Sequence, residues 1–297
     1  MLNSPHLDIR RGIFLSASGI LILSPDGLLL RLIKDAGTAD IVFYRSIFMS
    51  ITLALILCWF NRGDWLKPRQ YFKRCFGRQF DRYAVFACLL MTISNIAFVG
   101  AIVNTTVANV LVILAAMPLF SALLGWVLIR EGIERRTWFA ILVAFSGVVV
   151  IFAGSLQSGG WLGNGLALFT ALSQGLTLVV LRRAKTDVVL PALCVSGLFS
   201  AAICLFFASP GNVTQHDLII LAVMGLFVVP IALALFLSGT RYIPAAEVAL
   251  FALLETVIGP ILVWLGVGEV PAFATWIGGG IVMTAIIVNS ILALRSQ

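Results

Sequence analysis

The sequence predicts an all-α polytopic membrane protein with ten transmembrane helices in two inverted five-helix repeats. Composition, the spacing of apolar runs and an internal repeat support this fold class. Of the 297 residues, 61% are hydrophobic and only 11% are charged, whereas a soluble domain carries about 25% charged residues. The apolar runs are also too long for a disordered chain or for the short alternating strands of a membrane β-barrel.

Ten apolar runs bounded by charged residues, glycine, proline or short polar clusters are the expected spans. They cover residues 12–33, 38–60, 83–103, 107–129, 137–154, 162–181, 188–208, 217–240, 246–266 and 273–294. At about 20 apolar residues per helix, ten spans use roughly 200 residues, so most connections hold only a turn. The first run is too long and too interrupted by polar residues for a cleaved signal peptide.

Basic residues predict the orientation of the spans, because positive charges are retained on the cytoplasmic side. One side holds 17 of the 20 Lys and Arg residues, seven of them in the connection 61–82. We therefore expect a multi-pass protein of a bacterial-type cytoplasmic (inner) membrane, with both termini cytoplasmic. Aromatic residues lie between these basic residues, which favours contact with anionic membrane lipids over nucleic acid.

The motifs and residue spacings that are typical of enzymes and metal sites are missing from the sequence. The five cysteines and two histidines have no metal-ligand spacing, so we expect neither a metal nor a cofactor. The chain also lacks the zinc-protease, serine-hydrolase and phosphate-loop motifs. An enzyme and an ATP-driven pump are therefore disfavoured.

An internal repeat relates the two halves of the chain. A shift of 138 residues superposes the fourth and fifth spans on the ninth and tenth, and it pairs Trp126 with Trp264 and Glu131 with Glu269. A weaker match at 151 residues relates the first span to the sixth. Each half contains an odd number of spans, so the second half must enter the membrane with the opposite topology.

The expected repeats are residues 1–154 and 155–297. Inverted repeats are associated with transport by alternating access. The chain also resembles the EamA type of the drug/metabolite transporter superfamily, most clearly in residues 115–126 and in the segment that runs from Leu253 through Glu255 to Glu269. This sequence has Glu255-Thr256 where the family commonly has Glu-Pro.

The resemblance implies a secondary active transporter that exports small polar or amphipathic metabolites, such as amino acids or their derivatives. It further implies a central cavity that Asp26, Asn95, Gln174 and Glu255 border. Two alternatives remain: an importer of larger nucleotide-like, riboflavin-like or metallophore cargo, and an intramembrane channel. The partners expected are a small-molecule substrate, membrane lipids, protons as coupling ion and a second copy of the chain, but no nucleic acid.

Glu255 is the deepest acid in the expected spans. A charged residue near the bilayer centre costs about 2.5–3.5 kcal/mol on insertion scales, so its presence needs an explanation. One hypothesis is that Glu255 binds a cationic group of the substrate or a coupling proton. The alternative is a buried glutamic acid that joins helices by hydrogen bonding.

Asp26 and Arg45 lie at a common depth in the first and second spans, about four residues or 6 Å from the centre. We expect an ion pair that hides both charges from lipid. The competing hypothesis is that the pair opens during transport and offers its charges to a zwitterion. Arg31 lies nearer the interface, where its side chain can extend to water.

Three further positions are gate candidates. Asn109 and Glu247 are equivalent in the repeat and begin the fourth and ninth spans, although simple interfacial solvation is the alternative. Pro118 lies at mid-membrane, where it is expected to break or kink the fourth span. The amides of Asn95 and Gln174 either orient the substrate in a wet cavity or bond neighbouring helices.

Overall fold

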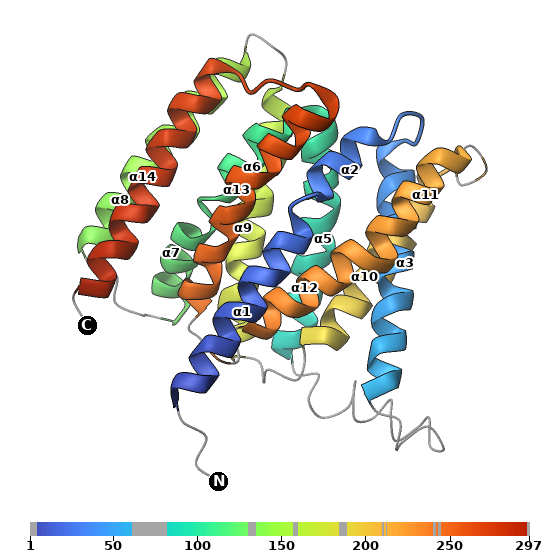
Figure 1. Cartoon of the computed structure of the whole chain (residues 1–297), viewed down its shortest axis with the longest axis horizontal. Helices are drawn as coiled ribbons and strands as arrows, with labels where there is room; N and C mark the ends of the chain where they lie inside the picture. The colour runs from blue at the N-terminus through green and yellow to red at the C-terminus, as the bar shows by residue number, and fades with distance from the viewer. Residues whose placement is uncertain are drawn as a thin grey trace.

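The computed structural model describes residues 5–60, 82–129, 135–156, 160–183, 189–209, 211, 213–239, 242 and 245–295. Every regular element in these ranges is helical (Figure 1). The elements are α1 (Pro5–Leu23), α2 (Asp26–Leu32), α3 (Thr38–Phe60), α5 (Arg82–Asn104), α6 (Val107–Leu114), α7 (Met117–Ile129), α8 (Arg135–Leu156), α9 (Trp161–Arg183), α10 (Val189–Leu205), α11 (Gln215–Val223), the π-helical turn η4 (Met224–Val228), α12 (Val229–Ser238), α13 (Ala245–Val267) and α14 (Phe273–Arg295).

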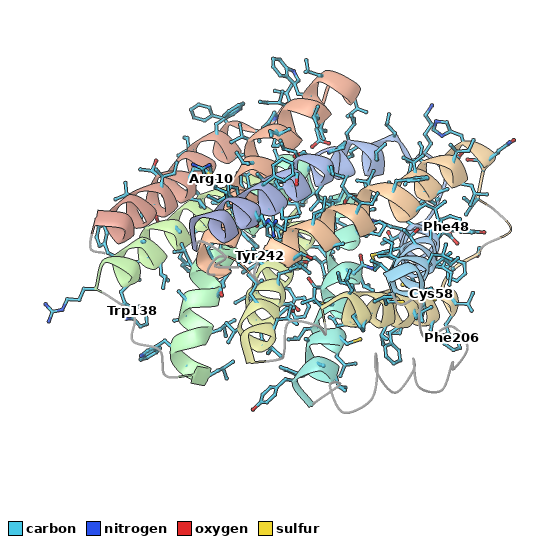
Figure 2. The ribbon with its side chains drawn as sticks, turned by 60° about the horizontal axis from the view of Figure 1, so that its bottom comes forward. Arg10, Phe48, Cys58, Trp138, Phe206 and Tyr242 are labelled. Atoms are coloured by element: carbon cyan, nitrogen blue, oxygen red, sulfur yellow. The ribbon has the colours of Figure 1, made fainter. Side chains whose placement is uncertain are left out.

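The helices follow the expected apolar runs in order. Among the described residues, six helical stretches are long and apolar enough to cross a membrane, and four shorter apolar helices occupy the remaining runs. The side chains that face outward are suited to lipid, as Phe206 illustrates with 87% of its surface exposed (Figure 2). A helical membrane fold is therefore confirmed, and the number of ten crossings stays a prediction.

Proline divides two of the expected spans. Pro118 has no N–H to donate to the carbonyl of Leu114, and α6 ends at Leu114. We expected the break at Pro118 itself, but the structure places it at Ala115–Ala116. Pro118 instead occupies the first turn of α7, where a backbone N–H needs no partner. In the first span, Ser24–Pro25 similarly separates α1 from α2.

The eighth span contains the π turn η4, which ends two residues before Pro230. The carbonyl oxygen of Leu226 accepts a hydrogen bond of 3.0 Å from the hydroxyl of Thr52 in α3. Gly225 in the same turn lets the backbones approach, because a Cβ there would lie 2.7 Å from the carbonyl oxygen of Arg45. The irregular turn thus fixes the eighth span against the part of α3 that carries Arg45.

Helix packing repeats between the two halves of the chain. α8 packs against α14 and α3 packs against α10, so equivalent spans of the two halves meet. The contact between α5 and α9, in the third and sixth spans, has its repeat equivalent in the contact between α12 and α1, in the eighth and first spans. Very close approaches support this packing: a Cβ on Gly147 of α8 would lie 2.6 Å from the carbonyl oxygen of Gly278 in α14.

The two ends of the bundle differ in which connections they carry. The start of α1 and the end of α14 lie at one end, which we call the inner end after the expected orientation (Figure 1). The connections α2–α3 and α13–α14 lie at the opposite, outer end (Figure 1). The connection 61–82 falls, apart from Arg82, outside the described residues.

Candidate functional site

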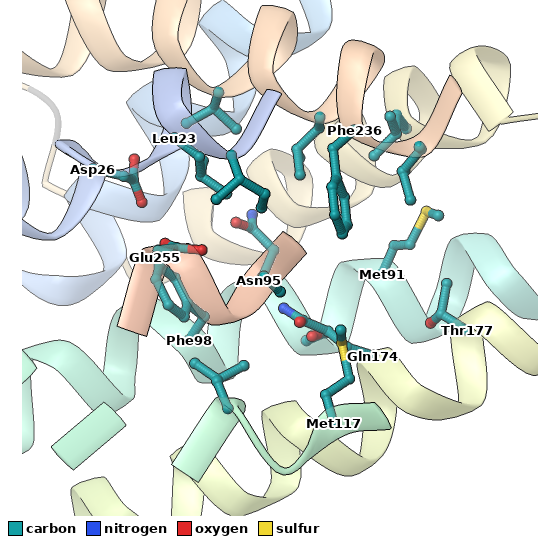
Figure 3. Close-up of a pocket in the computed structure, with 18 of the residues that line it drawn as sticks. Leu23, Asp26, Met91, Asn95, Phe98, Met117, Gln174, Thr177, Phe236 and Glu255 are labelled. Carbon is teal, nitrogen blue, oxygen red and sulfur yellow. The ribbon is translucent and has the colours of Figure 1, made fainter. Parts of the chain in front are cut away.

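A cavity of about 190 Å³ lies inside the bundle and receives side chains from both halves of the chain. Its polar lining is concentrated around α2, α3, α5, α9 and α13, whereas most other lining residues are apolar. Figure 3 shows Asp26 and Glu255 together at one end of the cavity and Met91 and Thr177 toward the other. The polar lining residues that bear on function are Asp26, Arg45, Asn95, Gln174, Thr177 and Glu255.

The Asp26–Arg45 pair forms the polar centre of the first repeat. An Nη2 group of Arg45 lies 2.9 Å from Oδ2 of Asp26, and the two side chains are only 6% and 1% exposed. Asp26 is the first residue of α2 after the Pro25 break, so the positive end of the helix dipole favours its carboxylate. The expected ion pair is therefore present, and it connects the first and second spans.

Asn95 extends this centre to the third span. Its Oδ1 accepts a 3.0 Å hydrogen bond from Nη1 of Arg45, and its Nδ2 donates one of 2.9 Å to Oγ of Ser46. The guanidinium also lies 5.7 Å from the centre of the Phe98 ring, within the range of a cation–π contact. Neutral and aromatic groups thus hold Arg45 in place without adding charge.

Glu255 differs from Asp26 in its surroundings. It is partly exposed at the cavity wall, opposite Asp26 and within electrostatic reach of Asp26 and Arg45 (Figure 3). Among the described residues it makes no hydrogen bond or ion pair. The hypothesis of a glutamic acid that only joins helices has no such contact to support it.

Gln174 lies at the cavity wall beside Met117 (Figure 3). Gly175 next to it allows α9 to approach α7 closely, since a Cβ there would lie 3.1 Å from the backbone nitrogen of Ser121. The hydroxyl of Thr177 donates to the carbonyl oxygen of Ser173, one helical turn earlier. The side-chain amide of Gln174 and the hydroxyl of Thr177 are the polar groups that α9 contributes to the cavity lining.

Apolar side chains complete the wall, and sequence reasoning missed them. They include Met49, Met91, Phe98, Met117, Leu193 and Phe236. Unbranched methionine side chains adapt to irregular shapes. Nothing in an apolar span distinguishes a cavity-lining Met or Phe from one that faces lipid or core, so these residues carried no signal.

A polar network closes the outer end of the bundle. Nε of Arg31 lies 2.8 Å from Oε2 of Glu269, and Arg31 also donates to the carbonyl oxygen of Thr105. The other carboxylate oxygen of Glu269 accepts from the backbone N–H of Val107, at the start of α6. We had expected the side chain of Arg31 only to extend to water. The structure instead pairs it with the second repeat.

The gate candidate Asn109 belongs to the same outer region. It is buried, which contradicts simple interfacial solvation. Its Oδ1 accepts from the hydroxyl of Thr275, and its Nδ2 lies 3.3 Å from Oδ1 of Asn164. Its repeat equivalent Glu247 lies in α13, but its side chain falls outside the described residues. Neither Asn109 nor Pro118 lines the cavity.

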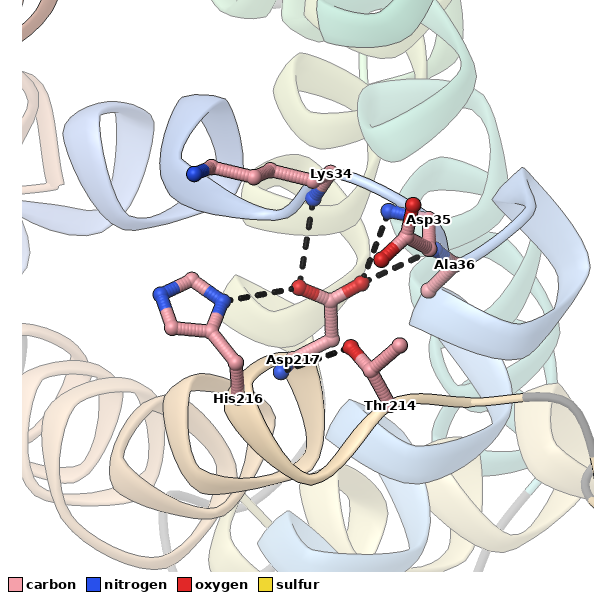
Figure 4. Close-up of polar contacts among 6 residues, drawn as sticks. All are labelled: Lys34, Asp35, Ala36, Thr214, His216 and Asp217. Carbon is pink, nitrogen blue, oxygen red and sulfur yellow. Dashed lines mark hydrogen bonds and ion pairs between the residues drawn. The ribbon is translucent and has the colours of Figure 1, made fainter.

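Asp217 adds a second outer contact, which Figure 4 shows. Its carboxylate accepts backbone N–H bonds of 3.2, 2.9 and 3.0 Å from Lys34, Asp35 and Ala36. The α2–α3 connection is therefore held against the start of α11.

Among the residues that the structure describes, no cluster of three or more His, Cys, Asp or Glu side chains could hold a metal.

Comparison with known proteins decides the family. The model of the EamA-like transporter family matches residues 10–153 and again residues 161–291. The chain belongs to the EamA-like transporter family. This places it in the drug/metabolite transporter superfamily, with one family repeat in each half. The resemblance inferred from residues 115–126 and from the Glu255 segment is confirmed.

Solved structures support the fold of this EamA-like protein. Seventeen chains match, and one of them, a crystal structure of a protein, is 16% identical with a TM-score of 0.68. The match covers 96% of this chain and 98% of the other. At that identity the likeness shows the fold alone. No curated protein matches the chain.

Proposed function

We propose that this EamA-like membrane transporter is a secondary active carrier that exports small polar or amphipathic metabolites, such as amino acids or their derivatives, by alternating access. The observation that carries the proposal is the central cavity, to which both repeats contribute and at whose wall Glu255 has no direct partner among the residues that the structure describes. Inverted repeats that rock about such a pocket are the structural basis of alternating access. The inversion itself follows from the predicted five spans in each half.

The arrangement of contacts supports a carrier that alternates rather than an open channel. At the outer end, Arg31, Glu269 and Asp217 join elements of different spans by short polar contacts. Toward the inner end, the cavity lining reaches Leu237, the last residue but one of α12. Export then begins with uptake of substrate from the inner end and proceeds by release of the outer contacts.

The size of the cavity supports a small substrate. Pockets for drug-sized ligands typically have about 300–1,000 Å³, and this cavity has about 190 Å³. A nucleotide-like or riboflavin-like cargo would require a substantial expansion, so import of a larger metabolite is the weaker candidate.

The proposal has two further parts. Transport is coupled to protons, with Glu255 as the carrier of the proton, and the chain assembles into a homodimer in the inner membrane.

Reconstitution into proteoliposomes tests the function. Vesicles loaded with an unlabelled metabolite mixture should accumulate labelled substrate by counterflow, because a carrier exchanges one molecule for another. An imposed proton gradient should accelerate the flux. Uptake that only equilibrates, without transient accumulation, would indicate a channel and contradict the proposal.

A further inference from the structure

We propose that the cavity selects an amphipathic substrate with a net positive charge, an amine without a free carboxylate, over the corresponding zwitterionic amino acid. This inference rests on the proposed transport function and narrows its substrate class. The observations behind it are the number of charged groups at the cavity wall, the contacts that each of them already makes, and the apolar character of the remaining lining.

The described lining of the cavity contains two acids and one base, namely Asp26, Glu255 and Arg45. Asp26 and Arg45 neutralise each other directly. When all three groups are ionised, the cavity therefore has one negative charge in excess, and that charge is located on Glu255. An ammonium group supplies the missing counter-charge, whereas a zwitterion brings an additional carboxylate that needs a cation of its own.

Arg45 is poorly placed to be that cation. Its two Nη groups already donate to Asp26 and Asn95, and its side chain is 6% exposed. A substrate carboxylate that took over the guanidinium would leave Asp26, which is 1% exposed, as an unpaired buried charge. Breaking a buried pair in this way is strongly unfavourable. No other Lys or Arg belongs to the described lining.

Glu255 is accessible where Arg45 is not. It is partly exposed to the cavity, and charge-assisted hydrogen bonds from an ammonium are among the stronger contacts available there. Beyond this end, Met91, Met117 and Phe236 offer a surface to which an apolar substituent of a few carbons fits. The complementary ligand has an amine at one end and an apolar chain at the other.

A matched pair of probes with the same apolar chain tests the selectivity. Leucine is the zwitterion and 3-methylbutylamine is its net cationic counterpart. Binding of both to the full chain in detergent micelles avoids the passive leak of amines through vesicles. We expect the amine to bind about tenfold tighter than leucine, and we expect Glu255→Gln to abolish that preference. Asp35→Asn removes an exposed acid outside the cavity and should preserve it.

The outcomes separate the inference from the proposed function. Equal binding of the two probes, or tighter binding of leucine, would overturn the inference. That result would favour opening of the Asp26–Arg45 pair toward a zwitterion. Counterflow of leucine would in that case still support the carrier. Counterflow is measured in addition with the permanently charged N-trimethyl derivative of the amine, which does not leak. Absence of binding and of counterflow for every probe would overturn the inference and the small-metabolite carrier together.

Discussion

The Asp26–Arg45 ion pair makes a quantitative prediction about stability. Both side chains are almost fully buried, so replacing either one by alanine leaves the other as an uncompensated charge, at a cost of about 3–5 kcal/mol. Arg45→Ala additionally leaves Oδ1 of Asn95 without its donor, which adds about 1–3 kcal/mol. The double variant has no orphaned charge. Each single change should therefore cost more than half of what the double change costs.

The assay is a double-mutant cycle on the free energy of unfolding, measured with purified protein in mixed micelles. The Arg31–Glu269 pair is a matched control within the same chain, because its side chains are 25% and 20% exposed. This pair is partly open to solvent, and solvent screening reduces fully exposed pairs to about 0–1 kcal/mol, so its coupling energy should be smaller than that of the buried pair. Simple additivity of the Asp26 and Arg45 changes would show that neither charge depends on the other.

Three further predictions concern transport, closure and packing. Glu255→Gln should abolish proton-dependent flux while folded protein remains in the membrane; normal flux with normal pH dependence would remove this residue from the mechanism. Glu269→Gln should weaken the outer closure. The reporter is Leu114→Cys in a chain whose native cysteines are replaced. With Glu269→Gln present, this cysteine should react faster with an impermeant maleimide added from the outer side. An unchanged rate would show that Glu269 does not control access. Gly147→Leu should lower the unfolding temperature because α8 and α14 would have to separate, whereas the same change at Gly165, where a Cβ meets open space, should have little effect.

Which residues lie within the membrane spans could be predicted from the sequence, because transfer of apolar surface into lipid depends mainly on composition over a window. The expected run 38–60 and helix α3 have the same bounds, and α14 differs from its run by one residue. The equal depth of Asp26 and Arg45 could also be predicted, because the rise per residue of a helix converts distance along the sequence into depth. The sequence alone therefore determined the helical membrane fold, the family and the common level of Asp26 and Arg45.

Only the tertiary structure decided which faces of the helices meet. Arg31 and Glu269 are separated by more than two hundred residues, and their pairing depends on how the two repeats dock. The same holds for Met91 and Phe236, which are ordinary apolar residues until packing places them around a common cavity. In lipid, apolar side chains are favourable on every face of a helix, so hydrophobicity sets the depth of a residue but not its direction.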